Sequence, residues 1–351
     1  MIDGADFRGL LDKVHALEQQ VQLQAQLLEA QKCAPVADIR QANSVGVSKW
    51  AGGVLAGNGK IYGMPLGSGS VLIIDPNTNA VDTTSITGFG DGTKWNGGVL
   101  GGNGKIYGIP YDAQAVLVID PTTNTADTTI IVGLTGVGKW VDGVLAGNEK
   151  IYCIPRDSVS VLIIDPITNS ADATTITGLD GGAKWTAGVL AGNGKIYGIP
   201  HSSPSVLIID PATNTADIST ITGLVGSAKW RHGVLANNGK IYGIPLEATS
   251  VLIIDPTTNT VDTTTMSGLD GDTKWFWGVR AGSGKIFGIP YSSSAVLIID
   301  PATNTTDTTT ITGLGEDCCK WRSGVLAGNG KIYSIPGNSP DVLTITRGCA
   351  L

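Results

Sequence analysis

From residue 49 onward, apolar and polar positions repeat as one unit that begins with a Lys-Trp pair. Successive pairs are 45 residues apart five times and then 46 residues apart once. A fixed period of this length is typical of repeat proteins, in which each unit buries its apolar face against its neighbours. The chain therefore contains seven copies of one structural unit.

Each unit contains four strand patterns separated by turns. In the first unit they are Gly52–Gly57, Lys60–Pro65, Val71–Asp75 and the polar, Thr-rich Val81–Thr87. Asn58-Gly59 predicts a two-residue hairpin between the first two strands, and the recurring Asp-Pro-x-Thr-Asn sequence predicts a turn built on Asx hydrogen bonds. Four antiparallel strands repeated seven times predict an all-β fold, a seven-bladed β-propeller.

The two ends of the repeat region complement each other. The last copy supplies only three strands, Gly324–Gly328, Lys331–Pro336 and Val342–Thr346. The missing fourth strand has a counterpart near the other terminus, at Asp38–Ala42. We therefore expect the N-terminal strand to complete the seventh blade, which removes two open sheet edges, and we assign residues 35–351 to the propeller.

Residues 1–34 form a separate segment with a heptad pattern. Positions a and d of the heptad are Phe7, Leu10, Val14, Leu17, Val21, Gln24, Leu28 and Gln31. Lys13 and Glu18 stand at g and e with opposite charges, as pairing between helices requires. The pattern predicts an amphipathic or coiled-coil helix across residues 6–32 that makes the chain a homo-oligomer. The alternative is a helix docked on the chain's own propeller.

Two sequences in each unit resemble a known repeat. GVLAGNGKIYGIP (188–200) and SVLIIDPATNTAD (205–217) are similar to the Tyr-Val-Thr-Asn (YVTN) class of propeller repeat, and the Asp-x-x-Thr-Asn turn is the most specific part of the likeness. The resemblance covers all seven copies. It implies a propeller that is often a surface or binding protein, and it implies no single chemistry because the fold hosts many.

Composition limits the partners and the compartment. Only 15% of the 351 residues are charged, Gly reaches 49, and the net charge is −7. A negative charge argues against nucleic acid or an anionic membrane as partner. No apolar run is long enough for a transmembrane segment, and the N-terminus lacks the pattern of a secretory signal. We therefore expect a soluble, cytosolic protein.

One face of the predicted disc carries nearly all the differences between copies. The loop after the second strand and the two residues after each Trp vary, whereas the turns of the other face barely change. The variable loops surround the mouth of the channel, so this face is the candidate binding surface. The alternative is drift in surface loops, which tolerate substitution. The candidate residues are Arg156, His201, Arg231, His232, Phe276, Trp277, Tyr291 and Arg322.

Two rings of repeated side chains border the same mouth. The indoles could stack on sugars, but an aromatic residue that recurs in every blade is more often core between sheets. The residue after Ile-Tyr, Gly63 in the first copy, is always small, and we expect a Trp of the next blade against it. The lysines could hold an anion at the axis, or each could lie over its Trp and pair with a local Asp. The rings are Lys49, Lys94, Lys139, Lys184, Lys229, Lys274 and Lys320, and Trp50, Trp95, Trp140, Trp185, Trp230, Trp275 and Trp321.

The five cysteines suggest two disulfides. Cys33 and Cys349 fall in the same turn of the seventh blade, one from each terminus, and a bond between them would close the ring. Such a bond would imply a secreted or lumenal protein instead of a cytosolic one. Cys318 and Cys319 are adjacent and could form a vicinal disulfide, whereas Cys153 is expected to be an inert buried thiol.

Residues for catalysis are few. The three histidines are His15, His201 and His232, and none stands in a metal-ligand spacing. We therefore expect no metal and no cofactor. The sequence favours a non-enzymatic interaction or scaffold propeller that binds a protein partner or a ligand through the variable face. The alternatives are a multivalent lectin that binds glycan on the Trp ring, and a lyase or hydrolase that uses His201 or His232.

Overall fold

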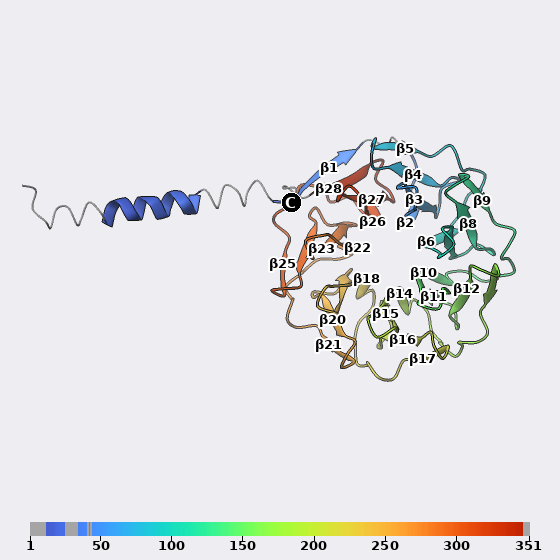
Figure 1. Ribbon diagram of the computed structural model, residues 1–351. Coiled ribbons are helices and arrows are strands. Elements are labelled where there is room, and N and C mark those ends of the chain that lie inside the picture. Colours follow the sequence, from blue (N-terminus) through green and yellow to red (C-terminus); the bar gives the residue numbers. More distant parts are fainter. Residues whose placement is uncertain (1–11, 25–33, 41, 43, 347–351) are drawn as a thin grey trace, which may run out of the picture.

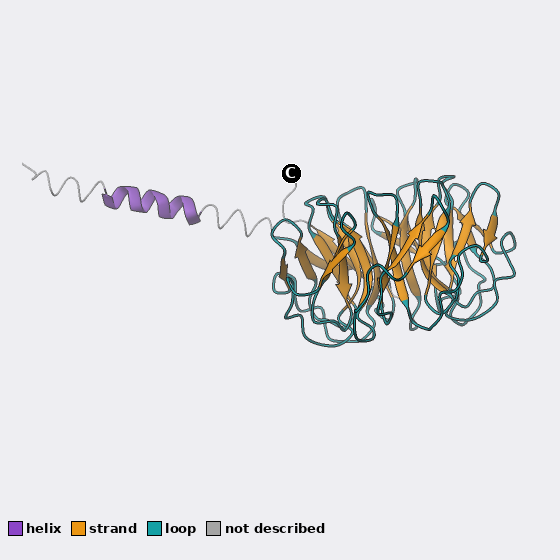
Figure 2. Ribbon diagram, turned by 90° about the horizontal axis from the view of Figure 1, so that it is seen from below, coloured by secondary structure: helices purple, strands orange, loops and turns teal. Residues whose placement is uncertain are grey.

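The computed structural model describes residues 12–24, 34–40, 42 and 44–346. Seven four-stranded antiparallel sheets lie around a central axis (Figure 1). Seen from the side, the sheets form a disc, with loops on both faces (Figure 2). The predicted seven-bladed β-propeller is confirmed.

Each blade runs from an innermost strand, which begins at the repeated Trp, to an outermost strand. The innermost strands are β2 (Trp50–Leu55), β6 (Trp95–Leu100), β10 (Trp140–Leu145), β14 (Trp185–Leu190), β18 (Trp230–Leu235), β22 (Trp275–Arg280) and β26 (Trp321–Leu326). The second strands are β3 (Ile61–Pro65), β7 (Ile106–Pro110), β11 (Ile151–Pro155), β15 (Ile196–Pro200), β19 (Ile241–Pro245), β23 (Ile286–Pro290) and β27 (Ile332–Pro336). The third strands are β4 (Leu72–Asp75), β8 (Leu117–Asp120), β12 (Leu162–Asp165), β16 (Leu207–Asp210), β20 (Leu252–Asp255), β24 (Leu297–Asp300) and β28 (Val342–Thr346). The outermost strands are β5 (Ala80–Asp82), β9 (Thr125–Asp127), β13 (Ser170–Asp172), β17 (Thr215–Asp217), β21 (Thr260–Asp262), β25 (Thr305–Asp307) and β1 (Val36–Arg40). Blade 1 contains β2–β5, the following blades continue in chain order, and blade 7 contains β26, β27, β28 and β1.

The N-terminal strand closes the ring, as predicted. β1 pairs antiparallel with β28, with Val36 opposite Thr346 and Arg40 opposite Val342. The pairing places the first and last strands of the propeller in the same sheet. The N-terminal strand therefore supplies the fourth strand of blade 7 and covers the edge of β28.

Two strand boundaries differ from those predicted. The innermost strands begin at the Trp and contain a bulge, between Ala51 and Gly53 in blade 1. The outermost strands are shorter, because the Asp82 carboxylate accepts hydrogen bonds from the backbone N–H groups of Thr84 (2.7 Å) and Ser85 (3.1 Å) and so ends β5. Such local side-chain bonds compete with pairing between strands.

The hydrophobic core lies between neighbouring blades. Trp185 of blade 4 packs with Tyr152 and Ile154 of blade 3. Gly188 makes this approach possible, since a Cβ there would lie 2.7 Å from side-chain atoms of Ile154. The expectation that a Trp of the next blade lies against the small residue after Ile-Tyr is wrong. A Cβ at Gly198 would instead meet Leu207 of its own blade at 2.9 Å.

Hydrogen bonds between blades tie the face that bears the turns after the first and third strands. In blade 4, Asn193 Nδ2 donates to the Tyr197 hydroxyl (3.0 Å) and to the Pro256 carbonyl of blade 5 (3.1 Å). The Tyr197 hydroxyl in turn donates to Asn259 Oδ1 at 2.8 Å. We call this group the Tyr latch, and the face that it ties the constant face. The Tyr latch hydroxyls belong to Tyr62, Tyr107, Tyr152, Tyr197, Tyr242 and Tyr333.

The N-terminal segment is helical at residues 12–24. Its heptad side chains are exposed, at 47% for Val14, 60% for Leu17 and 63% for Val21. The other apolar heptad positions, at residues 7, 10 and 28, and Gln31 lie outside the described residues, so pairing of two helices stays a prediction. No helix within the described ranges is long and apolar enough to cross a membrane.

Candidate functional site

The repeated lysines have a structural role. They lie on the variable face, which is the face formed by the loops after the second and fourth strands of each blade. Lys184 is 4% exposed, and its Nζ donates to the carbonyls of Arg156 (3.0 Å), Ser158 (3.0 Å) and Gly181 (2.6 Å). Burial lowers the pKa of Lys184. Its amine ties its own entry loop to a loop of the preceding blade. All seven lysines are 3–7% exposed, and the hydrogen bonds of their amines go to backbone carbonyls and not to the side chain of an Asp.

The repeated tryptophans are equally inaccessible. All seven are between 2% and 4% exposed. The Trp185 Nε1–H donates to the Ser205 carbonyl at 2.7 Å, so the polar atom of the indole is satisfied inside the protein. Lys184 Nζ lies 5.9 Å from the centre of the same ring. These indoles form core between blades, and stacking on a sugar would require the core to open.

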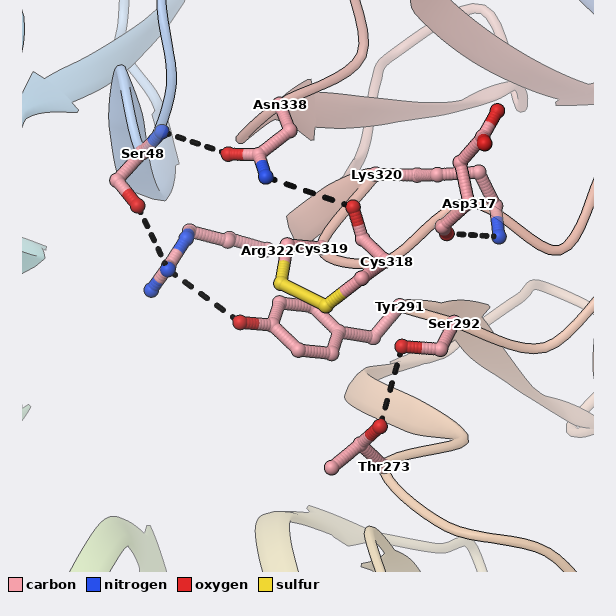
Figure 3. The surroundings of a disulfide bond; sticks show 10 residues. All are labelled: Ser48, Thr273, Tyr291, Ser292, Asp317, Cys318, Cys319, Lys320, Arg322 and Asn338. Atoms are coloured by element: carbon pink, nitrogen blue, oxygen red, sulfur yellow. Dashed lines mark hydrogen bonds between the residues drawn. A yellow bond between two sulfur atoms is a disulfide. The ribbon is translucent and has the colours of Figure 1, made fainter.

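Four variable residues from three blades come together at the mouth of the channel. The Phe276 and Tyr291 rings stack with their centres 4.6 Å apart, and the Arg231 guanidinium carbon lies 4.1 Å from the Phe276 ring centre. Arg322 Nη2 donates to the Tyr291 hydroxyl at 3.3 Å and to Ser48 Oγ at 3.1 Å (Figure 3). We call Arg231, Phe276, Tyr291 and Arg322 the mouth cluster.

A second layer lies one residue further along the innermost strands. His232 stacks on Trp277 with ring centres 3.6 Å apart, and His232 Nδ1 accepts from the Gly278 N–H at 3.3 Å. Asp142 Oδ2 accepts from the Gly188 N–H at 3.2 Å in the same way. Side chains at this position therefore bind a backbone amide of the next blade, beside the strand bulge.

The two histidines near the mouth are held neutral. Burial, with the positive charge of Arg231, lowers the pKa of His232 to about 3. Burial, followed by the charges of Arg231 and Arg156, lowers the pKa of His201 to about 4. Arg156 itself forms an ion pair with Asp157. Proton transfer near neutral pH is poorly matched to either histidine.

A vicinal disulfide borders the mouth cluster. Cys318 and Cys319 are bonded to each other in the loop that enters blade 7 (Figure 3). The Cys319 carbonyl accepts from the Asn338 N–H at 2.8 Å, and Asn338 Oδ1 accepts from the Ser48 N–H at 2.7 Å. Asn338 thereby joins this loop to Ser48, whose hydroxyl accepts a hydrogen bond from Arg322. Cys153 is a buried free thiol, whereas Cys33 and Cys349 lie outside the described residues.

Two cavities open among the loops of the variable face. One, of about 590 Å³, is lined by residues that include Asp270, Lys274 and Ser293. The other, of about 600 Å³, lies at the equivalent place one blade earlier, beside Lys229 and Glu247. Both belong to the repeated loop architecture, whereas the mouth cluster is made from residues that differ between blades.

Comparison with known proteins identifies the fold. No family model and no curated protein matches the chain. Among solved structures, a streptogramin B lyase aligns with a TM-score of 0.68 at 9% identity, over 90% of this chain and 98% of that one. A catalytically inactive variant of virginiamycin B lyase from Staphylococcus aureus, with quinupristin, aligns with a TM-score of 0.72 at 8% identity, over 88% and 99%. Hydrazine synthase from Kuenenia stuttgartiensis aligns with a TM-score of 0.65 at 15% identity, over 87% and 97%. At these identities the likeness is one of fold.

The structure divides the predicted site residues into groups. Arg231, Phe276, Tyr291 and Arg322 form the mouth cluster, and His232 and Trp277 form the layer beside it. Arg156 lies over the Tyr111 ring at 5.7 Å, and His201 Nδ1 lies 3.1 Å from Ser202 Oγ.

Sequence reasoning missed three contacting residues of this region. The Ser48 hydroxyl accepts a hydrogen bond from Arg322, and the Thr186 carbonyl accepts one from Arg231. The Asp142 carboxylate accepts one from the Gly188 amide. Thr186 and Asp142 stand at the same variable positions after the Trp, so comparison of the copies held the signal for them.

Proposed function

We propose that this chain is a non-enzymatic binding propeller whose partner or ligand docks at the mouth cluster. The carrying observation is that Arg231, Phe276, Tyr291 and Arg322, which are among the most divergent positions of the copies, form one connected group. Clustered aromatic and arginine side chains are the residue types that dominate binding energy at interfaces. The repeated Lys and Trp of the same face are buried and satisfied within the propeller. Within the mouth cluster, Arg231 and Phe276 are 7% and 6% exposed, and the partly exposed Tyr291 and Arg322 are the side chains that a partner would contact.

The proposal extends to the assembly of the protein. The exposed heptad positions Val14, Leu17 and Val21 support a self-associating helix. Several copies of one mouth cluster would then bind a repetitive partner with avidity. Membership of the YVTN repeat class and a scaffold role in a larger assembly fit this proposal.

The two other functions considered from the sequence have less support. The lectin hypothesis needs accessible indoles, and the seven repeated Trp side chains are 2–4% exposed. The enzyme hypothesis needs a histidine that titrates near neutral pH, and the pKa values of His201 and His232 are lowered to about 4 and about 3. Two compared structures are lyases by name, but at 8–9% identity they inform the fold alone.

Affinity capture with matched baits tests the proposal. Tyr291→Ala removes half of the aromatic stack on the variable face. Arg280→Ala serves as control, because Arg280 ends β22 on the constant face, at the opposite end of that strand from Phe276, and bonds to Asn237 at 2.6 Å. We expect a partner that the wild type and Arg280→Ala both retain and Tyr291→Ala loses. Capture that depends on Arg280 and not on Tyr291 would move the binding site to the constant face.

A further inference from the structure

Positive charge is concentrated at the mouth of an otherwise acidic protein. The chain carries a net charge of −7. Arg231 and Arg322 nevertheless form no ion pair with any carboxylate in the described ranges. Arg231 is 7% exposed, so its charge is largely removed from water. A buried guanidinium without a carboxylate in ion-pair contact is unfavourable, and a bound anion would relieve that cost.

The two guanidiniums have donors left over. Arg231 donates from Nη1 to the Thr186 carbonyl at 3.0 Å, and its other N–H groups bond to no residue that the structure describes. Arg322 donates from Nη2 to Ser48 and Tyr291. The Arg322 Nε is buried and has no hydrogen-bond partner among the described residues. A buried donor without a partner makes the Arg322 guanidinium more costly to bury, and an anion bound to the rest of the guanidinium would offset part of that cost.

The neighbouring charges increase the need for an anion. Burial, followed by the repulsion of Arg322, lowers the pKa of Arg231 to about 10, and Arg156 adds to the repulsion. Asp142 is the acid that acts on Arg231, but its carboxylate accepts from the Gly188 amide and forms no ion pair with the guanidinium. Both guanidiniums lie against the Phe276 ring, with their central carbons 4.1 Å and 5.4 Å from its centre, and two arginines gathered at one ring are an arrangement that an oxyanion stabilises.

The aromatic rings fix the direction of both donors. The Arg231 guanidinium lies 4.1 Å from the Phe276 ring centre, and the Arg322 guanidinium lies 5.6 Å from the Tyr291 ring centre. Packing against a ring holds a planar guanidinium in one orientation and leaves its edge for hydrogen bonding. A planar fork of N–H groups matches the paired oxygens of a carboxylate or a phosphate group, not a spherical ion such as chloride.

We propose that the mouth cluster binds an oxyanion, a carboxylate or phosphate group of its ligand, between Arg231 and Arg322. This inference rests on the proposed function, since it names the ligand chemistry recognised at the same face. The Nη1 group of Arg322, which bonds to no described residue, and the unused Arg231 donors supply the hydrogen bonds. The Phe276 and Tyr291 rings supply an apolar wall beside them.

Calorimetric titration of the purified full chain tests this site. The probes are inorganic phosphate and acetate, with chloride at matched ionic strength as reference. We expect phosphate, acetate or both to bind where chloride does not. Tighter binding of phosphate assigns a phosphate-bearing ligand, and tighter binding of acetate assigns a carboxylate.

Matched variants locate the binding. Arg322→Gln should weaken binding of the better probe by about tenfold or more, the effect of losing one charge-assisted hydrogen bond. Arg280→Gln makes the same change of charge on the constant face and should bind like the wild type. Arg322→Lys keeps the charge without the fork, and we expect intermediate affinity. Arg231 is buried, so thermal unfolding must first show that the Arg231→Gln variant folds. If it does not fold, the result for Arg322→Gln decides whether the oxyanion site exists.

The outcomes separate this inference from the proposed function. Oxyanion binding that is no better than chloride, or that Arg322→Gln leaves unchanged, overturns the inference even if Tyr291→Ala still loses a captured partner. The partner would then be recognised through the aromatic stack alone. Conversely, binding of phosphate or acetate that depends on Arg322 supports the oxyanion site, even when capture of a partner does not depend on Tyr291. In that case only the proposed partner surface would be contradicted.

Discussion

The hydroxyl of Tyr333 lies 3.0 Å from Asn79 Oδ1, and the two residues belong to the last and first blades of the ring. The same hydroxyl lies 3.2 Å from the Pro76 carbonyl and accepts from Asn329 Nδ2 at 3.1 Å. This Tyr latch therefore joins blade 7 to blade 1 across the point where the ring closes. It works alongside the pairing of β1 with β28, which completes blade 7 itself.

Removal of this one hydroxyl should destabilise the propeller. Tyr333→Phe leaves Asn79 Oδ1 without its donor, while the Pro76 carbonyl still accepts from Asn329 Nδ2 at 2.9 Å, and we expect the free energy of unfolding to fall by about 1 kcal/mol. Denaturant unfolding followed by Trp fluorescence measures it. Tyr62→Phe is the matched control, because the Tyr62 hydroxyl lies 3.5 Å from Asn124 Oδ1 and should contribute less. Equal losses in the two variants would contradict this reading of the ring closure.

The fold could be predicted from sequence because the period fixes the number of blades and the ends supply the missing strand. The Tyr latch could not, because its partners are far apart: Asn193 bonds to the Pro256 carbonyl of another blade. Asn58-Gly59 also has the composition of a hairpin turn, which hides the second role of the Asn. The sequence does contain one signal for the latch. Blade 6 has Ser283 and Phe287 where the other blades have the Asn and Tyr of the latch. In blade 7, which follows it, no continuous turn joins β28 to β1, so the latch residues are missing where the turn that they would bind is also missing.

The candidate site was predictable in its positions and not in its contacts. Comparison of the copies selects the residues after each Trp, which is how Arg231, Phe276 and Arg322 were found. The contact of Arg231 with the Phe276 ring depends on the close approach of neighbouring blades, which a strand pattern does not specify. The role of the repeated lysines was harder to predict. Their amines bind backbone carbonyls, which every residue has, so no particular residue type in the sequence marks the partner.

The glycine before the repeated Val-Leu limits how closely two blades pack. Gly188→Ala places a Cβ within 2.7 Å of Val144 and Ile154 side chains of the preceding blade. Overpacking of this kind costs about 1–3 kcal/mol, which should appear as a lower midpoint of denaturant unfolding. Gly192→Ala in the same blade is the control, because no atom lies within 4 Å of its new Cβ. A similar loss in both would mean that backbone freedom and not space is limiting.

The exposed heptad helix should determine the oligomeric state. Leu17 is 60% exposed at a d position, so Leu17→Asp would place a charge in the seam between paired helices. We expect light scattering to show an oligomer for the wild type and a monomer for this variant. Gln19→Asp, at the outward f position of the same turn, should leave the mass unchanged. A monomeric wild type would rule out self-association.

Asp142 should make stability depend on pH in the acid range. Burial raises the pKa of its carboxyl from 3.8 to about 6, and the Gly143 and Gly188 amides and then Arg231 only partly oppose the shift. The folded chain thus binds this proton more tightly than the unfolded chain. The stabilisation is fully present below pH 3.8 and is lost as pH rises through about 6.

Asp142→Asn removes this dependence and keeps an oxygen that can accept from Gly188. Relative to the wild type, the variant should gain about 2.4 kcal/mol of unfolding free energy between pH 4 and pH 7, since one pKa unit corresponds to about 1.4 kcal/mol and the unfolded carboxyl is already partly ionised at pH 4. Urea unfolding at a series of pH values measures the difference. Ser323→Ala is the control, because Ser323 Oγ accepts from the Gly53 N–H in the same manner and carries no titrating group. Its difference from the wild type should be the same at every pH, and an equally flat result for Asp142→Asn would show that the buried carboxylate carries no such penalty.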